Sequence, residues 1–305
     1  MGDLLMSLPG IRAVRRALPE TRIHLLMQNG LLPLLRGHPD IDELHGLEPG
    51  RDRGGTNLLR TALWMRRRRF DAVLMMNPSK FFHLASFLAG VPLRIGYLRK
   101  WGFLLNRSIP DTKGQRNLHE SQYNLELVRL LRIPAEEEPL EIPVPAEADA
   151  QAGVLLSAAG IPPGEEPVAI HPWTSNPAKS WPLDRFLQAA RQLRQAGRAV
   201  VFIGVPPEGT PENLAVDGSV DLSGRTPLEI LPAFLKKCAL LLSNDSGPVH
   251  VAAAVGTPTV VVASGSHAAQ MERWKPLGRR HRVLIDPSVE EVIGCVRQAE
   301  QPKPA

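Results

Sequence analysis

The sequence predicts an α/β protein with two doubly wound domains, each a parallel sheet covered by helices on both faces. Short apolar segments alternate with amphipathic helical segments along the whole chain. The length of 305 residues suits two domains of about 150 residues each. A segment rich in Pro and Glu, residues 133–150, indicates a linker between them. We therefore expect domains over residues 1–145 and 146–305.

Each domain has its own expected elements. The expected strands are residues 22–27, 71–76 and 93–97, then 168–171, 199–203, 239–243 and 257–262. The expected helices are residues 9–17, 57–69, 81–89 and 118–131, then 183–195, 227–236, 247–255 and 289–299. Ligands of such sheets bind beyond the carboxyl ends of the strands, and the cleft between two such domains is the natural site.

The start of the chain differs from the usual start of a doubly wound domain. A doubly wound domain usually opens with a strand near the centre of its sheet, but the chain begins at Met1-Gly2-Asp3, at the turn where that strand would end. We therefore expect the first strand of domain 1–145 to be missing. A misassigned start is favoured over truncation.

Composition restricts the class of protein. A hydrophobic content of 43% and a charged content of 22% are typical of globular domains. The sequence has no run of 18 apolar residues and no basic segment before an apolar run, so we expect neither a membrane span nor a signal peptide. Cys238 and Cys295 lack metal or redox spacing and are expected to be reduced, as in a cytoplasm. Residues 1–145 hold 21 Lys/Arg against 15 Asp/Glu, which favours an anionic partner for that domain.

Common cofactor and metal motifs are absent from the sequence. It contains no GxGxxG, P-loop, CxxC or GxSxG pattern. His24, His38, His45 and His281 lack the spacing of metal ligands, so we expect no metal site.

The most informative segment is NDSGPVH at residues 244–250, between an apolar strand and an alanine-rich helix. Where a tight polar turn joins a strand to a helix, the free backbone N–H groups at the start of the helix can point at a bound phosphate. Ser246 is a candidate N-cap, and Gly247 lets a ligand approach closely. The alternative is that Asp245 and Ser246 only cap the helix; His250 and the motif described next favour phosphate binding.

The second motif is HPWTSNPAKSWP at residues 171–182, directly after an apolar strand. The hydroxyls of Thr174 and Ser175 are expected to donate to phosphate oxygens, and Lys179 to neutralise one of them. A solvated surface lysine is the alternative for Lys179, but a loop at the carboxyl edge of the sheet favours the binding role.

Two carboxylates complete the candidate site. Glu208, in GVPPEG at residues 204–209, is expected to accept hydrogen bonds from ribose hydroxyls, with an ordinary loop glutamate as the alternative. Asp3 is expected to face the interdomain cleft as a general base, with capping of a helix that begins near Leu4 as the alternative.

Together these motifs resemble glycosyltransferase family nine, the lipopolysaccharide heptosyltransferases. The resemblance rests on Gly2-Asp3 followed by Pro9 and a helix, on the Lys-x-Trp-Pro core of residues 171–182, on LSGRT at 222–226, and on residues 244–250 continuing into GTP at 256–258. Their order and spacing agree over nearly the whole chain. The missing strand before Gly2 departs from the family pattern.

The resemblance implies a GT-B architecture of two Rossmann-like domains, acceptor-binding over 1–145 and nucleotide-sugar-binding over 146–305. It implies inverting, metal-independent transfer of heptose from ADP-heptose to the lipopolysaccharide inner core, with no cofactor. By carry-over, Asp3 is the catalytic base that deprotonates the acceptor hydroxyl. The implied donor-binding residues are Thr174, Ser175 and Lys179 at the diphosphate, Glu208 at the ribose, the Thr226 backbone at the adenine, Asp245 at sugar hydroxyls, and Ser246, Gly247 and His250 in the phosphate turn.

The expected partners are a nucleotide-sugar donor and an anionic glycolipid acceptor, with no nucleic acid. The expected location is the cytoplasm, with peripheral contact at the inner membrane left open. Two alternatives stay open: a family member that uses another nucleotide sugar or acceptor, and a non-catalytic nucleotide-binding module. Turnover of ADP-heptose separates a heptosyltransferase from a family member with another substrate, and binding without turnover would select the module.

Overall fold

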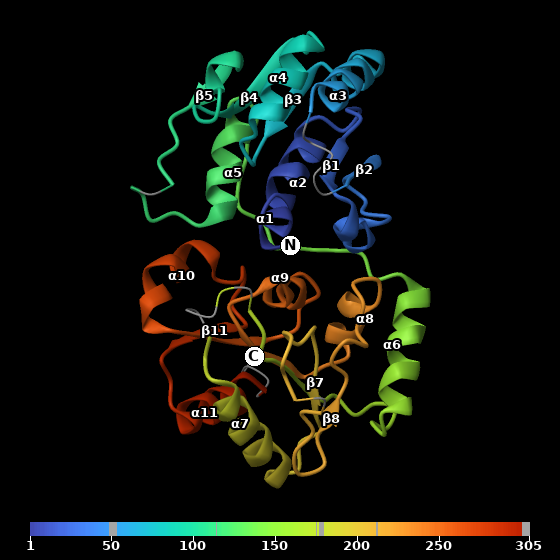
Figure 1. The fold of residues 1–305 in the computed structure, drawn as a ribbon, viewed down its shortest axis with the longest axis vertical. Helices are drawn as coiled ribbons and strands as arrows, with labels where there is room; N and C mark the ends of the chain where they lie inside the picture. The colour runs from blue at the N-terminus through green and yellow to red at the C-terminus, as the bar shows by residue number, and fades with distance from the viewer. Residues whose placement is uncertain (49–53, 114, 175, 177–179, 212, 301–305) are drawn as a thin grey trace. The chain divides into compact units, whose positions relative to one another are not determined.

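The computed structural model describes residues 1–48, 54–113, 115–174, 176, 180–211 and 213–300 (Figure 1). The chain divides into two compact units. Residues 6–138 form the N-terminal unit, and residues 1–5 together with the chain from Pro139 onward form the C-terminal unit. The boundary therefore precedes the expected one at 145, and Leu140 and Ile142 beyond it are buried. The first five residues, expected with the N-terminal domain, group with the other unit.

The N-terminal unit contains two parallel sheets. One pairs β1 (His24–Gln28) with β2 (Glu43–Leu47); the other has the order β3 (Ala72–Met75), β4 (Leu93–Tyr97) and β5 (Arg107–Ile109). The expected strands correspond to β1, β3 and β4, whereas β2 and β5 were not predicted. Among the described residues no strand precedes β1 and no strand pairing joins the two sheets. The helices of this unit are α2 (Leu8–Ala17), α3 (Gly55–Arg68), α4 (Lys80–Leu88) and α5 (Glu120–Arg129), with 3-10 turns η1 (Asn29–Leu35) and η2 (Gly102–Leu104).

The C-terminal unit has one six-stranded parallel sheet with the order β11-β10-β9-β6-β7-β8. The strands are β6 (Val168–His171), β7 (Val200–Phe202), β8 (Val220–Asp221), β9 (Leu240–Asn244), β10 (Thr259–Ala263) and β11 (His281–Ile285). The helices are α1 (Gly2–Leu5), α6 (Ala146–Ala158), α7 (Leu183–Gln195), α8 (Leu231–Lys236), α9 (Gly247–Ala254), α10 (Ala268–Trp274) and α11 (Val289–Glu300), with η4 (Gly265–His267). Because α6 begins at Ala146, the expected linker of residues 133–150 extended too far.

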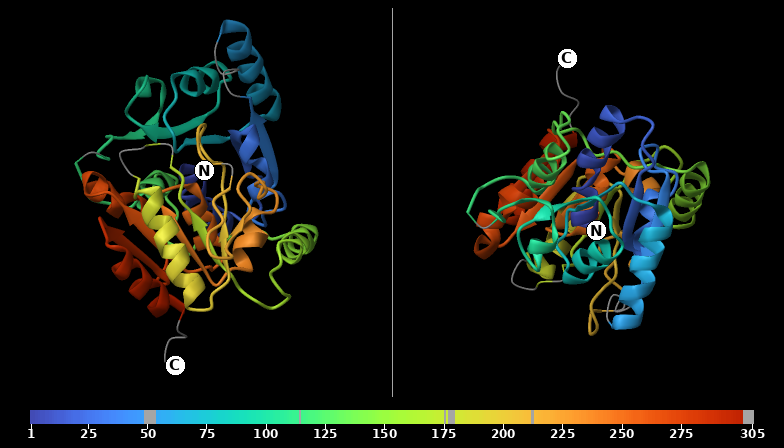
Figure 2. Two further views of the ribbon diagram at one scale, coloured as in Figure 1. Left: turned by 60° about the horizontal axis from the view of Figure 1, so that its bottom comes forward. Right: turned by 90° about the horizontal axis from the view of Figure 1, so that it is seen from above.

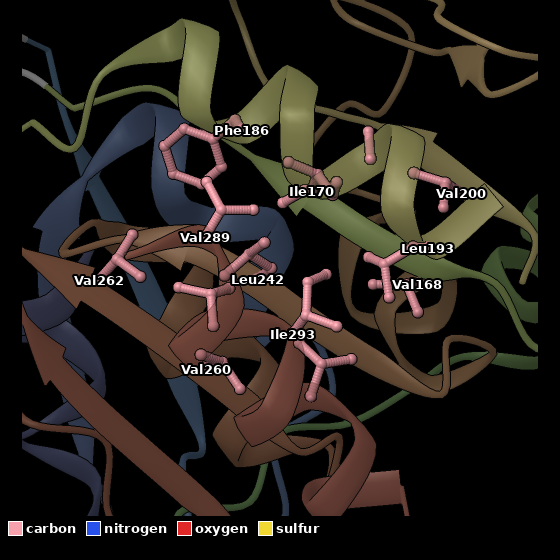
Figure 3. Close-up of a cluster of buried hydrophobic side chains, with 14 of the residues drawn as sticks. Val168, Ile170, Phe186, Leu193, Val200, Leu242, Val260, Val262, Val289 and Ile293 are labelled. Atoms are coloured by element: carbon pink, nitrogen blue, oxygen red, sulfur yellow. The ribbon is translucent and has the colours of Figure 1, made fainter. Parts of the chain in front are cut away.

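Helices cover both faces of this sheet. On one face α7 and α11 pack against each other and against the strands, with Phe186, Val289 and Leu242 pointing into a common core (Figures 2 and 3). On the other face Val249 of α9 packs with Val261 of β10. The four central strands are buried along their whole length, as is typical of a parallel sheet between two helical layers. This confirms the predicted α/β class.

Two other expectations concern membranes and cysteines. Across the parts of the chain that the structure describes, no helix combines the length and the apolar character needed to cross a membrane. Cys238 is buried and Cys295 is half-buried, and both are free thiols.

Candidate active site

The two polar motifs of the C-terminal unit leave the same edge of the sheet. Strands β6 and β9 are parallel neighbours, with His171 paired in register with Ser243. The carboxyl ends of parallel neighbours meet at one edge, so the loop after β6 and the turn after β9 start side by side. Motifs about 70 residues apart in the sequence are thereby brought together, as their positions after strands predicted.

The side chain of Asn244 holds these two motifs together. This residue is fully buried, and its Oδ1 accepts a hydrogen bond of 2.8 Å from the backbone N–H of Trp181. Its Nδ2 donates to the carbonyl of Pro172 at 2.6 Å and to Ser180 Oγ at 3.4 Å. The Trp181 indole donates to the carbonyl of Pro287 at 3.0 Å, which anchors the far end of the loop. Sequence reasoning gave Asn244 no role.

A buried histidine lies under the turn after β9. His171 Nδ1 is 3.1 Å from Ser246 Oγ and 3.2 Å from Ser243 Oγ, and the two hydroxyls are 3.1 Å apart. Ser246 occupies the N-cap position of α9 with an extended backbone, but its side chain makes no capping hydrogen bond to that helix. The hydroxyl is instead oriented by the histidine, so the capping alternative does not describe Ser246. Burial lowers the pKa of His171 to about 4, so the ring is neutral at pH 7.

This lowered pKa predicts a pH-dependent stability. The unfolded chain binds a proton at His171 below about pH 6.5, whereas the folded protein resists protonation until about pH 4. Stability contributed by the neutral ring is therefore complete above pH 6.5 and is lost as the pH falls towards 4, by about 3 kcal/mol. Urea unfolding between pH 7 and pH 4 measures this. His171→Gln should give a shallower fall, and parallel curves for the two proteins would contradict the assignment.

The Asp245 carboxylate contacts a histidine that follows a third strand, β10. Its Oδ2 lies 3.1 Å from Nε2 of His267, which closes η4 directly after β10, and both side chains are buried. The backbone carbonyl of Asp245 accepts a hydrogen bond of 3.5 Å from Thr174 Oγ1, which joins the two motifs again. Sequence reasoning missed His267, although it follows a buried strand at the same sheet edge.

Helix α1 belongs to the same unit as the turn after β9, so Asp3 lies in that unit. This helix packs on α9 so closely that a Cβ added to Gly247 would lie 2.8 Å from the sulfur of Met1. The buried ring of His250 lies against Gly2 on the same helix. Asp3 is exposed and lies inside α1, not at its N-cap, so the capping alternative does not describe it.

A pocket of the C-terminal unit lies beside β8, whose two residues both line it. This pocket, with a volume of about 600 Å³, is lined by residues that include Pro207, Ser223 and Arg225. Glu208 and Thr226 follow Pro207 and Arg225 in the sequence; Glu208 is exposed and Thr226 is half-buried. Both expected nucleoside-binding residues are therefore neighbours in the sequence of residues that line this pocket.

Two of the expected donor-binding residues, Ser175 and Lys179, lie outside the described residues. Among the described residues of the same motif, Thr174 is hydrogen-bonded to Asp245 and Trp181 to Asn244.

Solved structures with the same arrangement define the class of fold. The glycosyl transferase family 9 protein from Veillonella parvula aligns with a TM-score of 0.83 and 20% identity over 98% of this chain and 94% of its own. The E. coli ADP-heptose lps heptosyltransferase II aligns with a TM-score of 0.77 and 21% identity over 98% and 95%. The fold is thus of the GT-B type.

Sequence comparison identifies the family within that class. The model of glycosyltransferase family 9 (heptosyltransferase) matches residues 59–300, and the chain belongs to this family. Lipopolysaccharide heptosyltransferase 2 of Salmonella typhimurium is 26% identical over 93% of this chain and 85% of its own length. The chain is therefore a glycosyltransferase, as its motifs predicted.

Proposed function

We propose that the protein transfers heptose from ADP-heptose to the inner core of lipopolysaccharide, with inversion at the anomeric carbon. The observation that carries the proposal is that the segments after β6 and β9 begin side by side at one sheet edge in a family 9 chain. Relatives named for ADP-heptose and for lipopolysaccharide support the donor and the acceptor.

The chemistry is a single displacement. The Asp3 carboxylate takes the proton from an acceptor hydroxyl, the oxygen forms a bond to the anomeric carbon, and the bond from that carbon to ADP breaks. The diphosphate leaves with additional negative charge. Lys179, Thr174, Ser175 and the turn at 246–247 stabilise that charge without a metal.

The remaining roles divide between the two units. In the C-terminal unit, Glu208 binds the ribose, the Thr226 backbone binds the adenine, Asp245 binds sugar hydroxyls, and His250 supports the phosphate turn through its packing. The N-terminal unit binds the acceptor, and the excess of Lys/Arg in residues 1–145 suits an anionic glycolipid.

Direct assay tests the proposal. The purified protein is incubated with a heptose-deficient lipopolysaccharide acceptor and with ADP-heptose, ADP-glucose or UDP-glucose, and product is measured by mass spectrometry. We expect transfer from ADP-heptose alone, with the opposite anomeric configuration in the product. Transfer from another donor would select the alternative specificity, and calorimetric binding of ADP-heptose without turnover would select the non-catalytic module.

Donor binding should depend on Lys179. Lys179→Ala removes a charge-assisted hydrogen bond to the diphosphate, so ADP should bind more weakly by about 1.5–3 kcal/mol, or about 10–150-fold. Calorimetry measures the dissociation constant. Lys236→Ala, at an exposed helix end of the same unit, is the matched control and should bind ADP like the original protein. An unchanged constant for Lys179→Ala would remove this residue from the site.

Transfer should survive chelation, because the proposed site neutralises the diphosphate with its own donors. The protein is treated exhaustively with EDTA and assayed well below its melting temperature. We expect the rate to stay within about twofold of the untreated rate, a change that corresponds to less than about 0.5 kcal/mol in the barrier. A large loss that Mg²⁺ or Mn²⁺ restores would contradict the metal-independent mechanism.

A further inference from the structure

Three potential metal ligands meet on the two-stranded sheet of the N-terminal unit. His24 lies on β1 and is paired in register with Glu43 on β2, and His45 follows Glu43 by two residues. Side chains two residues apart on a strand point to the same face, so Glu43, directly opposite His24, and His45, diagonal to it, share one face of this sheet. The spacing of the histidines in the sequence did not predict this cluster, because its members come from two strands.

The three potential ligand atoms are close enough together to contact a single metal ion. His24 Nδ1 and His45 Nε2 are 3.0 Å apart, and Glu43 Oε2 is 3.7 Å from each of them. The point equidistant from these three atoms lies about 2.0 Å from each, within the range of zinc–histidine and zinc–carboxylate bonds, about 2.0–2.2 Å. Two histidines and one carboxylate with an open fourth position are a recurrent zinc ligand set.

The surroundings suit a partly enclosed site. The side chains of His24 and His45 are only 11% and 18% exposed. Edge-on aromatic contacts hold both rings: Phe70 lies 5.0 Å from His24 and Trp64 lies 4.8 Å from His45, between ring centroids. These contacts restrain the rings with their nitrogens facing each other.

One cation borders the cluster. Arg68 Nη1 donates to Glu43 Oε2 at 2.7 Å and to Oε1 at 3.0 Å. An ion bound to Oε2 leaves Oε1 for Arg68, which would then orient the carboxylate as an outer-shell partner. The positive charge of Arg68 also opposes a dication, so affinity at this site is lower than in a fully anionic zinc site.

We propose that His24, Glu43 and His45 form a structural Zn²⁺ site that fastens β1 to β2. A sheet of two strands is marginal without further support, and among the described residues no strand pairing joins this sheet to another. An ion bound by both strands would supply that support. The proposal concerns the N-terminal unit and does not depend on the transferase reaction.

Zinc titration tests the site directly. Tag-free protein is stripped with EDTA, dialysed, and titrated with Zn²⁺ by calorimetry, with melting temperature measured in parallel. We expect one Zn²⁺ per chain and a higher melting temperature with Zn²⁺. His24→Gln, His45→Gln and Glu43→Gln should each weaken binding at least about tenfold, since even outer-shell changes cost about 10–100-fold. His281→Gln, a histidine bonded to Thr259 on the sheet of the other unit, is the matched control and should bind like the original protein.

A second measurement needs no ligand variant. Co²⁺ bound in place of Zn²⁺ should show the visible absorption of a four-coordinate ion. Ni²⁺ should quench Trp64, whose ring contacts His45, and the quenching should disappear in Trp64→Phe. The proposal is overturned if no stoichiometric Zn²⁺ binds, if Co²⁺ stays six-coordinate, or if the folded ligand variants bind Zn²⁺ as tightly as His281→Gln.

Discussion

Replacing Asp3 with asparagine is expected to lower the turnover number for heptose transfer by about 10²–10⁴-fold, the usual contribution of a general base. Asparagine has nearly the same size, so α1 should keep its packing on α9. The amide cannot accept the acceptor proton at neutral pH. The substitution should remove stabilisation of the transition state and leave the bound donor unaffected. The dissociation constant of ADP-heptose should therefore change far less than the turnover number.

The position of Asp3 makes this separation informative. Helix α1 belongs to the unit that carries the proposed phosphate-binding turn, so a role of Asp3 in donor binding is the alternative to be tested. Steady-state kinetics and calorimetry on the same preparation distinguish the roles. Asp71→Asn, an exposed aspartate in the other unit, is the matched control and should leave both constants unchanged. Equal losses in donor affinity and turnover would show that Asp3 binds donor and is not the base.

Replacing Asn244 with alanine is expected to destabilise the C-terminal unit by about 2–5 kcal/mol, because each buried polar group left without a partner costs about 1–3 kcal/mol. Two such groups result, the N–H of Trp181 and the carbonyl of Pro172. The loop of residues 171–182 would also lose its link to β9. We therefore expect weaker ADP binding in the fraction that remains folded.

Urea unfolding, followed by Trp fluorescence and by circular dichroism, measures the first effect, and calorimetry with ADP measures the second. Gln188→Ala is the matched control, because Gln188 is an exposed amide on α7 of the same unit. We expect that control to lose less than about 1 kcal/mol. If Asn244→Ala unfolds at the same urea concentration as the control, the buried amide does not hold the loop.

Local patterns in the sequence were enough to predict the strands that carry the site. The buried strands β6, β7, β9 and β10 are short apolar runs, and polar segments follow β6, β9 and β10. For the same reason residues 171–182 and 244–250 were predicted to be ligand loops before their partners were known. Edge elements such as β2, β8 and β11 were missed, because their burial is partial and their alternation is weak.

The sequence by itself determined the α/β class and the family, and it located the two candidate ligand loops. Only the tertiary structure decided which residues face one another: Asn244 with Trp181, Asp245 with His267, and Asp3 with the C-terminal unit. It alone also brought His24, Glu43 and His45 together. The physical reason is how far apart in the sequence the interacting residues are. A strand and its turn are specified by neighbours in the chain, whereas strand order and helix packing depend on contacts between residues tens to hundreds of positions apart, which no local pattern encodes.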